Sequence, residues 1–149
     1  MFWGEYFHTV DEKGRIIIPS KFRNILENKY IERFVILKWP DGCIAVFTEQ
    51  GFDKDVKKPL QKSSWAKASS RDINRALGAT VSFADCDSQG RINISQKLLD
   101  SASIKKDVAI IGTGNHFEIW DKDVWSNRQK EIKIEELLEK IADSFEQEE

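Results

Sequence analysis

An internal repeat is the feature of this sequence that most constrains its fold. Residues 11–18 (DEKGRIII) recur 76 positions later as residues 87–94 (DSQGRINI), and six of the eleven positions from the start of each match are identical. A second match, with an offset of 73, aligns residues 41–52 with residues 114–125. Self-similarity of this kind indicates two copies of one structural unit. The fold of this chain is therefore expected to have internal pseudo-symmetry.

The local sequence of each copy predicts the same order of elements: strand, tight turn, strand, short helix, strand, turn and strand. The Asp that opens the D-x-x-G-R turn can accept hydrogen bonds from following backbone N–H groups, and the Gly tolerates a positive φ. Such a turn closes a β-hairpin. Alternating isoleucines follow each turn and predict strands with one buried face. These isoleucines are Ile16, Ile18, Ile92 and Ile94.

A unit of about 45 residues buries too little surface to be stable alone. We therefore expect two half-barrels that interdigitate and complete each other's core, which also removes exposed sheet edges. The predicted fold class is α+β, a duplicated β-barrel with peripheral helices and a pseudo-two-fold axis. The expected parts are a first repeat (1–52), a basic helical connector interrupted at Pro59 and closed by Gly78 (53–79), a second repeat (80–126) and an acidic amphipathic helix or tail (127–149).

Charge is distributed unevenly along the chain. The net charge is −2, but residues 131–149 carry −6, so residues 1–130 carry +4. Residues 54–75 hold seven basic residues and two acids. A basic body permits an anionic partner without proving one, and a solvated helix face explains the same charges. The acidic end has an apolar stripe at helical spacing, which packs either on its own body or on a neighbouring subunit.

Several classes of protein do not fit this sequence. No apolar run approaches the roughly 20 residues that span a bilayer, so we expect no membrane partner. The two cysteines are expected to be free thiols. His8, Cys43, Cys86 and His116 lack the paired spacing of zinc ligands, so we expect no metal and no cofactor. The repeated Asp lacks the D-[ST]-G loop of an aspartic protease, and the adjacent Arg would lower its pKa, so no catalytic residue or small-molecule substrate is assigned.

Three motifs in order carry a family resemblance: MFWGEYFHTVDEKGR (1–15), DSQGR (87–91) and FEIW (117–120). Together they resemble the MraZ family of bacterial transcriptional regulators, which are built from two tandem AbrB-like swapped-hairpin units. The resemblance covers residues 1–126 and implies a non-enzymatic, sequence-specific regulator that binds double-stranded DNA. It further implies a repressor of the division and cell-wall gene cluster, acting on short direct repeats upstream of its own gene. It also implies a closed homo-oligomeric ring, octamer or dodecamer, and a cytoplasmic, nucleoid-associated protein.

The resemblance places the DNA contacts on the two hairpins. The matching residues are Lys13, Gly14, Arg15, Gln89, Gly90 and Arg91. An arginine just past a tight turn can reach a phosphate or the O6/N7 edge of guanine, and a lysine can contact the DNA backbone. Asp11 and Asp87 are expected to shape the turns and orient the arginines. Lys21 and Arg23, on the helix after the first hairpin, either flank the same groove or lie on a solvated helix face.

Two questions stay open at the level of sequence. The second hairpin has Gln89 where the first has Lys13, and Ser95 where the first has Pro19, so it is less basic and its share in DNA binding is open. The alternative function is an oligomeric protein-interaction scaffold whose basic patches are incidental. A scaffold would show no sequence preference among DNA duplexes.

Overall fold

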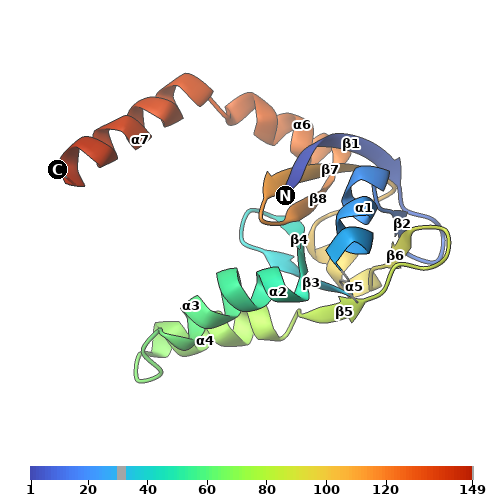
Figure 1. The fold of residues 1–149 in the computed structure, drawn as a ribbon, viewed down its shortest axis with the longest axis horizontal. Coiled ribbons are helices and arrows are strands. Elements are labelled where there is room, and N and C mark those ends of the chain that lie inside the picture. Colours follow the sequence, from blue (N-terminus) through green and yellow to red (C-terminus); the bar gives the residue numbers. More distant parts are fainter. Residues whose placement is uncertain (30–32, 149) are drawn as a thin grey trace.

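The computed structural model describes residues 1–29 and 33–148, with the side chains of all of these except 26–29 and 148 (Figure 1). The architecture is mixed α+β, with an antiparallel sheet and several helices, as predicted. The strands are β1 (Phe2–Thr9), β2 (Arg15–Ile17), β3 (Phe34–Trp39), β4 (Cys43–Thr48), β5 (Ser82–Ala84), β6 (Arg91–Asn93), β7 (Asp107–Gly114) and β8 (Phe117–Asp121). The helices are α1 (Ser20–Lys29), α2 (Glu49–Phe52), η1 (Asp53–Lys57), α3 (Lys58–Gln61), α4 (Ala68–Gly78), α5 (Gln96–Ser101), α6 (Lys122–Glu131) and α7 (Ile134–Glu148).

Strand pairing between the two copies of the repeat is reciprocal. β1 of the first copy pairs with β7 of the second, and β5 of the second pairs with β3 of the first. β4 pairs with β8, and β2 pairs with β6, all antiparallel. Each copy therefore supplies strands that extend the sheet of the other, which explains how two units too small to fold alone coexist in one chain.

The larger sheet is not closed into a barrel over the described residues. Its order is β1-β7-β8-β4-β3-β5, while β2 and β6 form a separate two-stranded sheet. The large sheet stays open because the chain leaves it after β1 and after β5. The expectation that each D-x-x-G-R turn closes a hairpin is therefore wrong: β1 pairs with β7 and β5 with β3, so β2 and β6 pair with each other across the two copies. Residues 11–17 and 87–93 are still called the first and second hairpin. We refer to this pair, β2 and β6, as the ribbon.

The main core lies between the ribbon, the large sheet and helices α1 and α5. Ile16, Ile18 and Ile92 of the predicted alternation are at most 1% exposed, and Ile94 is also buried. They pack in one cluster with the aromatic side chains of β1, α1, β3 and β8. Truncating a buried isoleucine to alanine typically costs about 2–5 kcal/mol. The ribbon is thus anchored by one face while its other face remains outside the core.

A helical arm projects from the body at the end of β4 (Figure 1). The expected interruption at Pro59 is wrong, because α2, η1 and α3 run on through this residue and the chain turns only at residues 62–67. The N–H of Lys58 bonds to the carbonyl of Asp53, five residues back. This wider π spacing relieves the clash between a proline ring and the preceding turn. α4 then returns along the arm and ends at Gly78, as expected.

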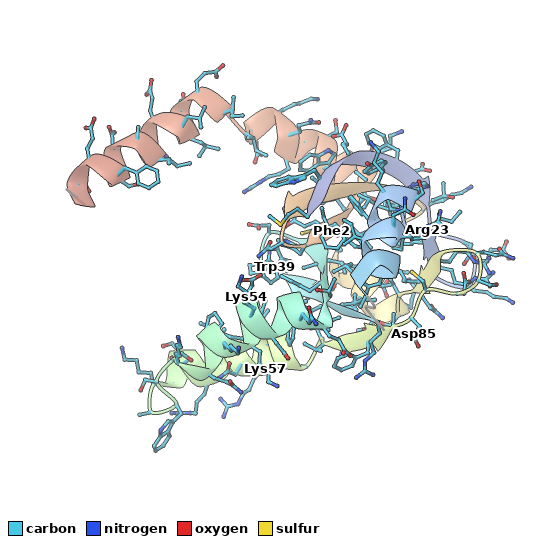
Figure 2. All side chains as sticks on the ribbon, viewed as in Figure 1. Phe2, Arg23, Trp39, Lys54, Lys57 and Asp85 are labelled. Atoms are coloured by element: carbon cyan, nitrogen blue, oxygen red, sulfur yellow. The ribbon has the colours of Figure 1, made fainter. Side chains whose placement is uncertain are left out.

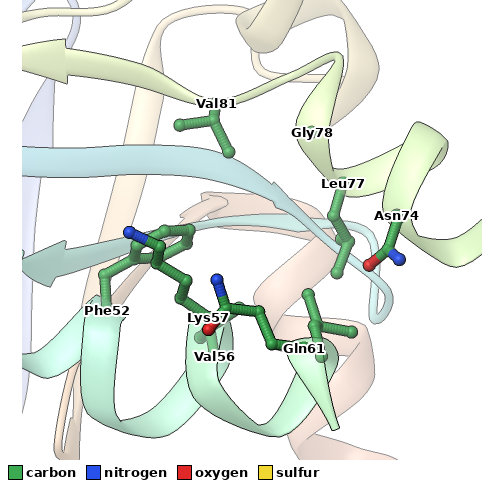
Figure 3. Close-up of a pocket in the computed structure, with 9 residues that line it drawn as sticks. Phe52, Val56, Lys57, Gln61, Asn74, Leu77, Gly78 and Val81 are labelled. Atoms are coloured by element: carbon green, nitrogen blue, oxygen red, sulfur yellow. The ribbon is translucent and has the colours of Figure 1, made fainter. Parts of the chain in front are cut away.

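The two sides of the arm pack through apolar residues and leave a cleft between them. Figure 3 shows Phe52 and Val56 facing Leu77 of α4 across this cleft, whose volume is about 260 Å³. Val56 is buried against the outer face of β3 and β4. The arm is therefore fixed to the sheet at its base.

The C-terminal segment contains two helices. α6 follows β8 directly, and α7 extends away from the body after a break at residues 132–133 (Figure 1). The predicted apolar stripe lies on α7, where its members are between 45% and 64% exposed. No helix in the described part of the chain is long and apolar enough to cross a membrane.

Candidate nucleic-acid interface

The first predicted turn is organised by the carboxylate of Asp11. Its Oδ1 accepts the backbone N–H groups of Lys13 and Arg15, both at 2.9 Å. Its Oδ2 accepts the guanidinium Nε–H of Arg15 at 2.7 Å. The backbone carbonyl of Asp11 accepts the N–H of Gly14 at 3.0 Å and closes the turn. One aspartate thus fixes both the shape of the turn and the direction in which the arginine leaves it.

The second turn has the same arrangement. Oδ1 of Asp87 accepts the N–H groups of Gln89 and Arg91 at 2.9 Å, and Oδ2 accepts the Nε–H of Arg91 at 2.8 Å. The backbone carbonyl of Asp87 accepts the N–H of Gly90 at 3.0 Å. Both copies of the repeat therefore present an arginine in the same local geometry.

These contacts stabilise the ionised form of both aspartates. The pKa of Asp11 is lowered from its usual value of 3.8, mainly because the carboxylate accepts the N–H of Arg15. Burial, the second-largest effect, opposes this shift, and the guanidinium of Arg15 and the N–H of Lys13 lower the pKa further. The pKa of Asp87 is lowered in the same way, with the N–H of Arg91 as the largest cause. Both carboxylates stay charged at neutral pH and keep hold of the Nε of their arginines.

The two arginines share one surface, the outer face of the ribbon. Ile16 pairs with Ile92 across the ribbon, and both are buried. Alternate residues of a strand point to opposite faces, so the neighbours of this pair point outward. These outward residues are Arg15, Ile17, Arg91 and Asn93. Arg15 and Arg91 are diagonal neighbours on the paired strands, and the backbones of such positions lie about 7–8 Å apart.

Each guanidinium keeps its terminal nitrogens available. Each aspartate engages its arginine through Nε, and within the described chain the terminal nitrogens of Arg15 and Arg91 have no hydrogen-bond partner. The side chains are 30% and 21% exposed, respectively. Two terminal N–H groups can donate in parallel to the O6 and N7 atoms of guanine or to a phosphate. The chemistry of this face is thus compatible with a planar, double acceptor.

Each turn is fixed against the strand of the other hairpin. The N–H of Ile94 donates to the carbonyl of Gly14 at 2.8 Å, and the N–H of Ile18 donates to the carbonyl of Gly90 at 2.9 Å. Both glycines have a φ of +78°, which other residues rarely adopt. Because β2 and β6 are antiparallel, the two turns lie at opposite ends of the ribbon.

Basic side chains flank both ends of the ribbon. Lys13 is exposed on the first turn. Arg23, labelled on α1 in Figure 2, lies at the second turn. Its Nε–H donates to the carbonyl of Ile18 at 3.0 Å, and its side chain occupies the space that a Cβ at Gly90 would enter. Arg23 therefore supplies a positive charge at the second turn, where Gln89 stands in place of the lysine of the first turn. Lys21 is exposed on α1.

Sequence reasoning missed two lysines beside the first turn. Lys105 and Lys106 are exposed, and with Asp11 and Gly14 they line a hollow of about 400 Å³. The N–H of Val10 donates to the carbonyl of Lys106 at 2.8 Å. A Lys-Lys pair just before a strand was visible in the sequence, but only the pairing of β1 with β7 brings it to the first hairpin.

Comparison with known proteins identifies the family to which this chain belongs. The family described as "MraZ protein, putative antitoxin-like" matches residues 1–76 and 78–147. The chain belongs to the MraZ family. A protein of Finegoldia magna named Transcriptional regulator MraZ is 39% identical over 145 residues, covering 96% of this chain and 98% of that protein. Proteins of the same name from Oenococcus oeni (39% over 147 residues; 99% and 93% covered) and Caldanaerobacter subterraneus (37% over 147 residues; 97% and 99% covered) are also similar.

This member of the MraZ family also has a polar cluster at the sheet, around His116. Its Nε2 lies 3.2 Å from Oε2 of Glu118, whose Oε1 accepts the Nε1–H of Trp120 at 3.0 Å. The imidazole stacks on Phe47 with ring centroids 4.6 Å apart. Burial, and then the charge of Glu118, raise the pKa of the free thiol of Cys43. In the described part of the chain no three His, Cys, Asp or Glu side chains are grouped to hold a metal ion, and this cluster is hydrogen-bonded packing.

Proposed function

We propose that this protein is a transcriptional regulator that binds double-stranded DNA sequence-specifically through the outer face of the ribbon. The observation that carries the proposal is that Arg15 and Arg91, from two copies of one repeat, share that face, each held at Nε by an aspartate. The relatives named Transcriptional regulator MraZ support the same class of function. A DNA-binding regulator needs no catalytic residue, and we assign no enzymatic activity to the chain.

The proposed binding mode places the ribbon in the major groove, which is wide enough to admit two antiparallel strands. Arg15 and Arg91 then donate to guanine edges on either side of the pseudo-two-fold axis. Their aspartates limit the rotamers that each arginine can adopt, so less conformational entropy is lost when a base is bound. Asn93, on the same face, adds a side-chain amide that can donate and accept at a base edge.

Phosphate contacts in this mode come from the ends of the ribbon. Lys13 and the missed pair Lys105 and Lys106 lie at one end, and Arg23 lies at the other. Such contacts fix the register of a protein on DNA but carry no sequence information. The second hairpin contributes through Arg91 and the neighbouring Arg23, although Gln89 itself is neutral. Lys21, further along the exposed face of α1, is assigned a weaker contact of the same kind.

The finer architecture proposed is a pair of AbrB-like swapped-hairpin units with a pseudo-two-fold axis. The reciprocal pairing of β1 with β7 and of β5 with β3 supports this assignment. The proposed parts are the first unit (1–52), the basic connector (53–79), the second unit (80–126) and the acidic C-terminal segment (127–149). Asp11 and Asp87 are assigned the shaping of the two turns.

The regulator is further proposed to be a repressor of the division and cell-wall gene cluster, located in the cytoplasm with the nucleoid. Its operator in this proposal consists of short direct repeats upstream of its own gene. A homo-oligomeric ring would engage successive repeats, and linkage through the ring raises the effective concentration of each next contact. Head-to-tail contacts between identical subunits close into rings when the rotation permits.

Fluorescence anisotropy with two labelled duplexes of identical composition tests the proposal. One carries the DNA upstream of the protein's own gene, and the other carries the same bases in scrambled order. We expect a preference of about 10³-fold or more that persists as salt rises. Equal affinities that fall together with salt would leave only a basic surface and would favour a protein-interaction scaffold.

A further inference from the structure

Helix α7 exposes an apolar stripe that no described residue of its own chain covers. The members of the stripe are Ile134, Leu137, Leu138, Ile141 and Phe145, between 45% and 64% exposed. They recur at the spacing of one helix face, and acidic residues occupy the opposite face. A solvent-exposed stripe of this regularity on a helix that stands away from the body marks a docking surface.

The helical arm has an exposed groove with an apolar lining. The groove, with a volume of about 490 Å³, lies between α4 and the end of β3. Its apolar lining comes from Trp39, Pro40, Ile73, Ala76 and Leu77. Ile73 is 50% exposed although it is one of the large apolar residues of α4. An amphipathic helix laid in such a groove buries residues at i, i+3, i+4 and i+7, which is the spacing of the α7 stripe.

The charges of the two elements are opposite. Residues 134–148 carry six acids and one lysine, a net charge of −5. Residues 54–75 of the arm carry a net charge of +5, and Lys38 lines the groove itself. Pairing of α7 with another α7 would bring two charges of −5 together, whereas the arm attracts it. Charge complementarity therefore selects the arm groove over a second α7 as the partner of the stripe.

We infer that α7 of one chain docks its apolar stripe into the arm groove of a second copy of the chain, in a head-to-tail contact. In Figure 1 the arm and α7 leave the same side of the body in different directions. Both the stripe and Ile73 of the groove are exposed. The contact is heterologous, because stripe and groove are different surfaces, so a docked pair still offers one free groove on the first copy and one free stripe on the second. Repetition of this contact generates a ring or a filament.

This inference rests on the proposed function, since it names the contact that would join DNA-binding subunits. The two surfaces do not compete. The ribbon lies on the opposite side of the body from the arm and the end of α7 (Figure 1). A subunit can therefore dock to its neighbours while the ribbon faces DNA.

Sedimentation velocity of the full-length protein tests the contact. Ile141→Gln removes a central residue of the stripe, and Ile73→Gln alters the groove. Asp143→Glu, on the opposite face of α7, keeps the acidic charge and is the matched control. We expect both apolar variants to weaken self-association by about 10-fold or more, and the control to leave it near the parent value. All three positions are exposed, so circular dichroism should show the parent's fold. A parent chain that stays monomeric at tens of micromolar would overturn the inference.

Disulfide trapping identifies the occupant of the groove. Ile141→Cys in an untagged chain is mixed with Ile73→Cys in a longer, tagged chain, both in a Cys86→Ser background. We expect a cross-linked species of mixed size, and none when Asp143→Cys replaces Ile141→Cys. Cross-linking of Ile141→Cys only with itself would show pairing of α7 with α7. Closure within a single chain carrying both substitutions would show fold-back. Either outcome overturns the inference.

A single-repeat duplex separates this inference from the proposed function. Ile141→Gln should bind a duplex with one repeat as well as the parent, while losing the added affinity that several repeats confer. If neither protein prefers operator DNA, the proposed function fails while the subunit contact stands. If Ile141→Gln keeps full multi-repeat affinity and full self-association, the contact fails while the function stands.

Discussion

The backbone N–H of Ile94 donates to the carbonyl oxygen of Gly14 at 2.8 Å, and this bond ties the strand of the second hairpin to the turn of the first. Its pseudo-symmetric counterpart joins Ile18 to Gly90. These two bonds join the backbones of the two hairpins into one ribbon. Damage to either turn is expected to move the arginines of both copies.

The two turn glycines provide a matched pair of substitutions. Both have a φ of +78°, so alanine at either position should cost about 1–2 kcal/mol of backbone strain. At Gly14 the added Cβ would also lie 2.7 Å from the carbonyl oxygen of Ile94, which is backbone and cannot swing away. At Gly90 the added Cβ would meet the side chain of Arg23, which can rotate. Gly14→Ala should therefore lower the free energy of unfolding more than Gly90→Ala does.

Urea denaturation of the two variants beside the parent measures this difference. We expect Gly14→Ala to show the lower midpoint at an unchanged slope. Equal midpoints, or a lower midpoint for Gly90→Ala, would contradict the close approach of the two hairpins.

The lowered pKa values of Asp11 and Asp87 predict how the turns respond to acid. A carboxylate with a folded pKa below its unfolded value stabilises the fold fully above that unfolded value, here 3.8, and the contribution disappears as pH falls through the folded pKa. The turns should therefore be insensitive to pH near neutrality and loosen only below about pH 3.8. A carbon-13 NMR titration of the two carboxyl groups should give both pKa values below 3.8.

Arg15→Ala is the control for this titration. It removes the guanidinium but keeps the backbone N–H, which is the largest cause of the shift. The pKa of Asp11 should rise part of the way towards its usual value, and that of Asp87 should stay as in the parent. A titration in which both aspartates respond alike to Arg15→Ala would mean that the two turns are not independent ion-pair sites.

Lys13 and Arg23 are predicted to contact phosphates at opposite ends of the ribbon. Lys13→Gln and Arg23→Gln should each weaken binding to operator and scrambled duplexes alike, and each should reduce the slope of log affinity against log salt by about one. Arg128→Gln, on α6 where Arg128 pairs with Glu131, is the matched control. If a variant at Lys13 or Arg23 has the same salt slope as Arg128→Gln, that residue does not contact DNA.

Local chemistry made the two turns predictable from sequence, but not the pairing partners of the strands beside them. The D-x-x-G-R turn and the isoleucine alternation depend only on neighbours, and both copies of the turn have the same hydrogen bonds. The position of Arg23 was not predictable, because α1 follows the first hairpin but lies against the second. Likewise, the outward pairing of Arg15 with Asn93 depends on the register between strands 76 residues apart.

The connector (53–79) shows what local sequence patterns do not predict. A proline usually ends or kinks a helix, so the sequence predicts a break at Pro59. The π-helical turn before Pro59 accommodates the proline ring, and no local sequence pattern predicts that turn. The exposure of the α7 stripe could not be predicted either. An apolar helix face in a sequence does not show whether it packs against its own chain or against another.

The most direct test of the account is the affinity of Arg15→Ala and Arg91→Ala for the operator duplex and its scrambled counterpart, measured by anisotropy at several salt concentrations. Each substitution should cost about 1–3 kcal/mol on the operator duplex and much less on the scrambled one, so that sequence preference falls. Arg128→Ala should change neither. If Arg15→Ala and Arg91→Ala keep the parent's preference for the operator, the outer face of the ribbon does not read DNA.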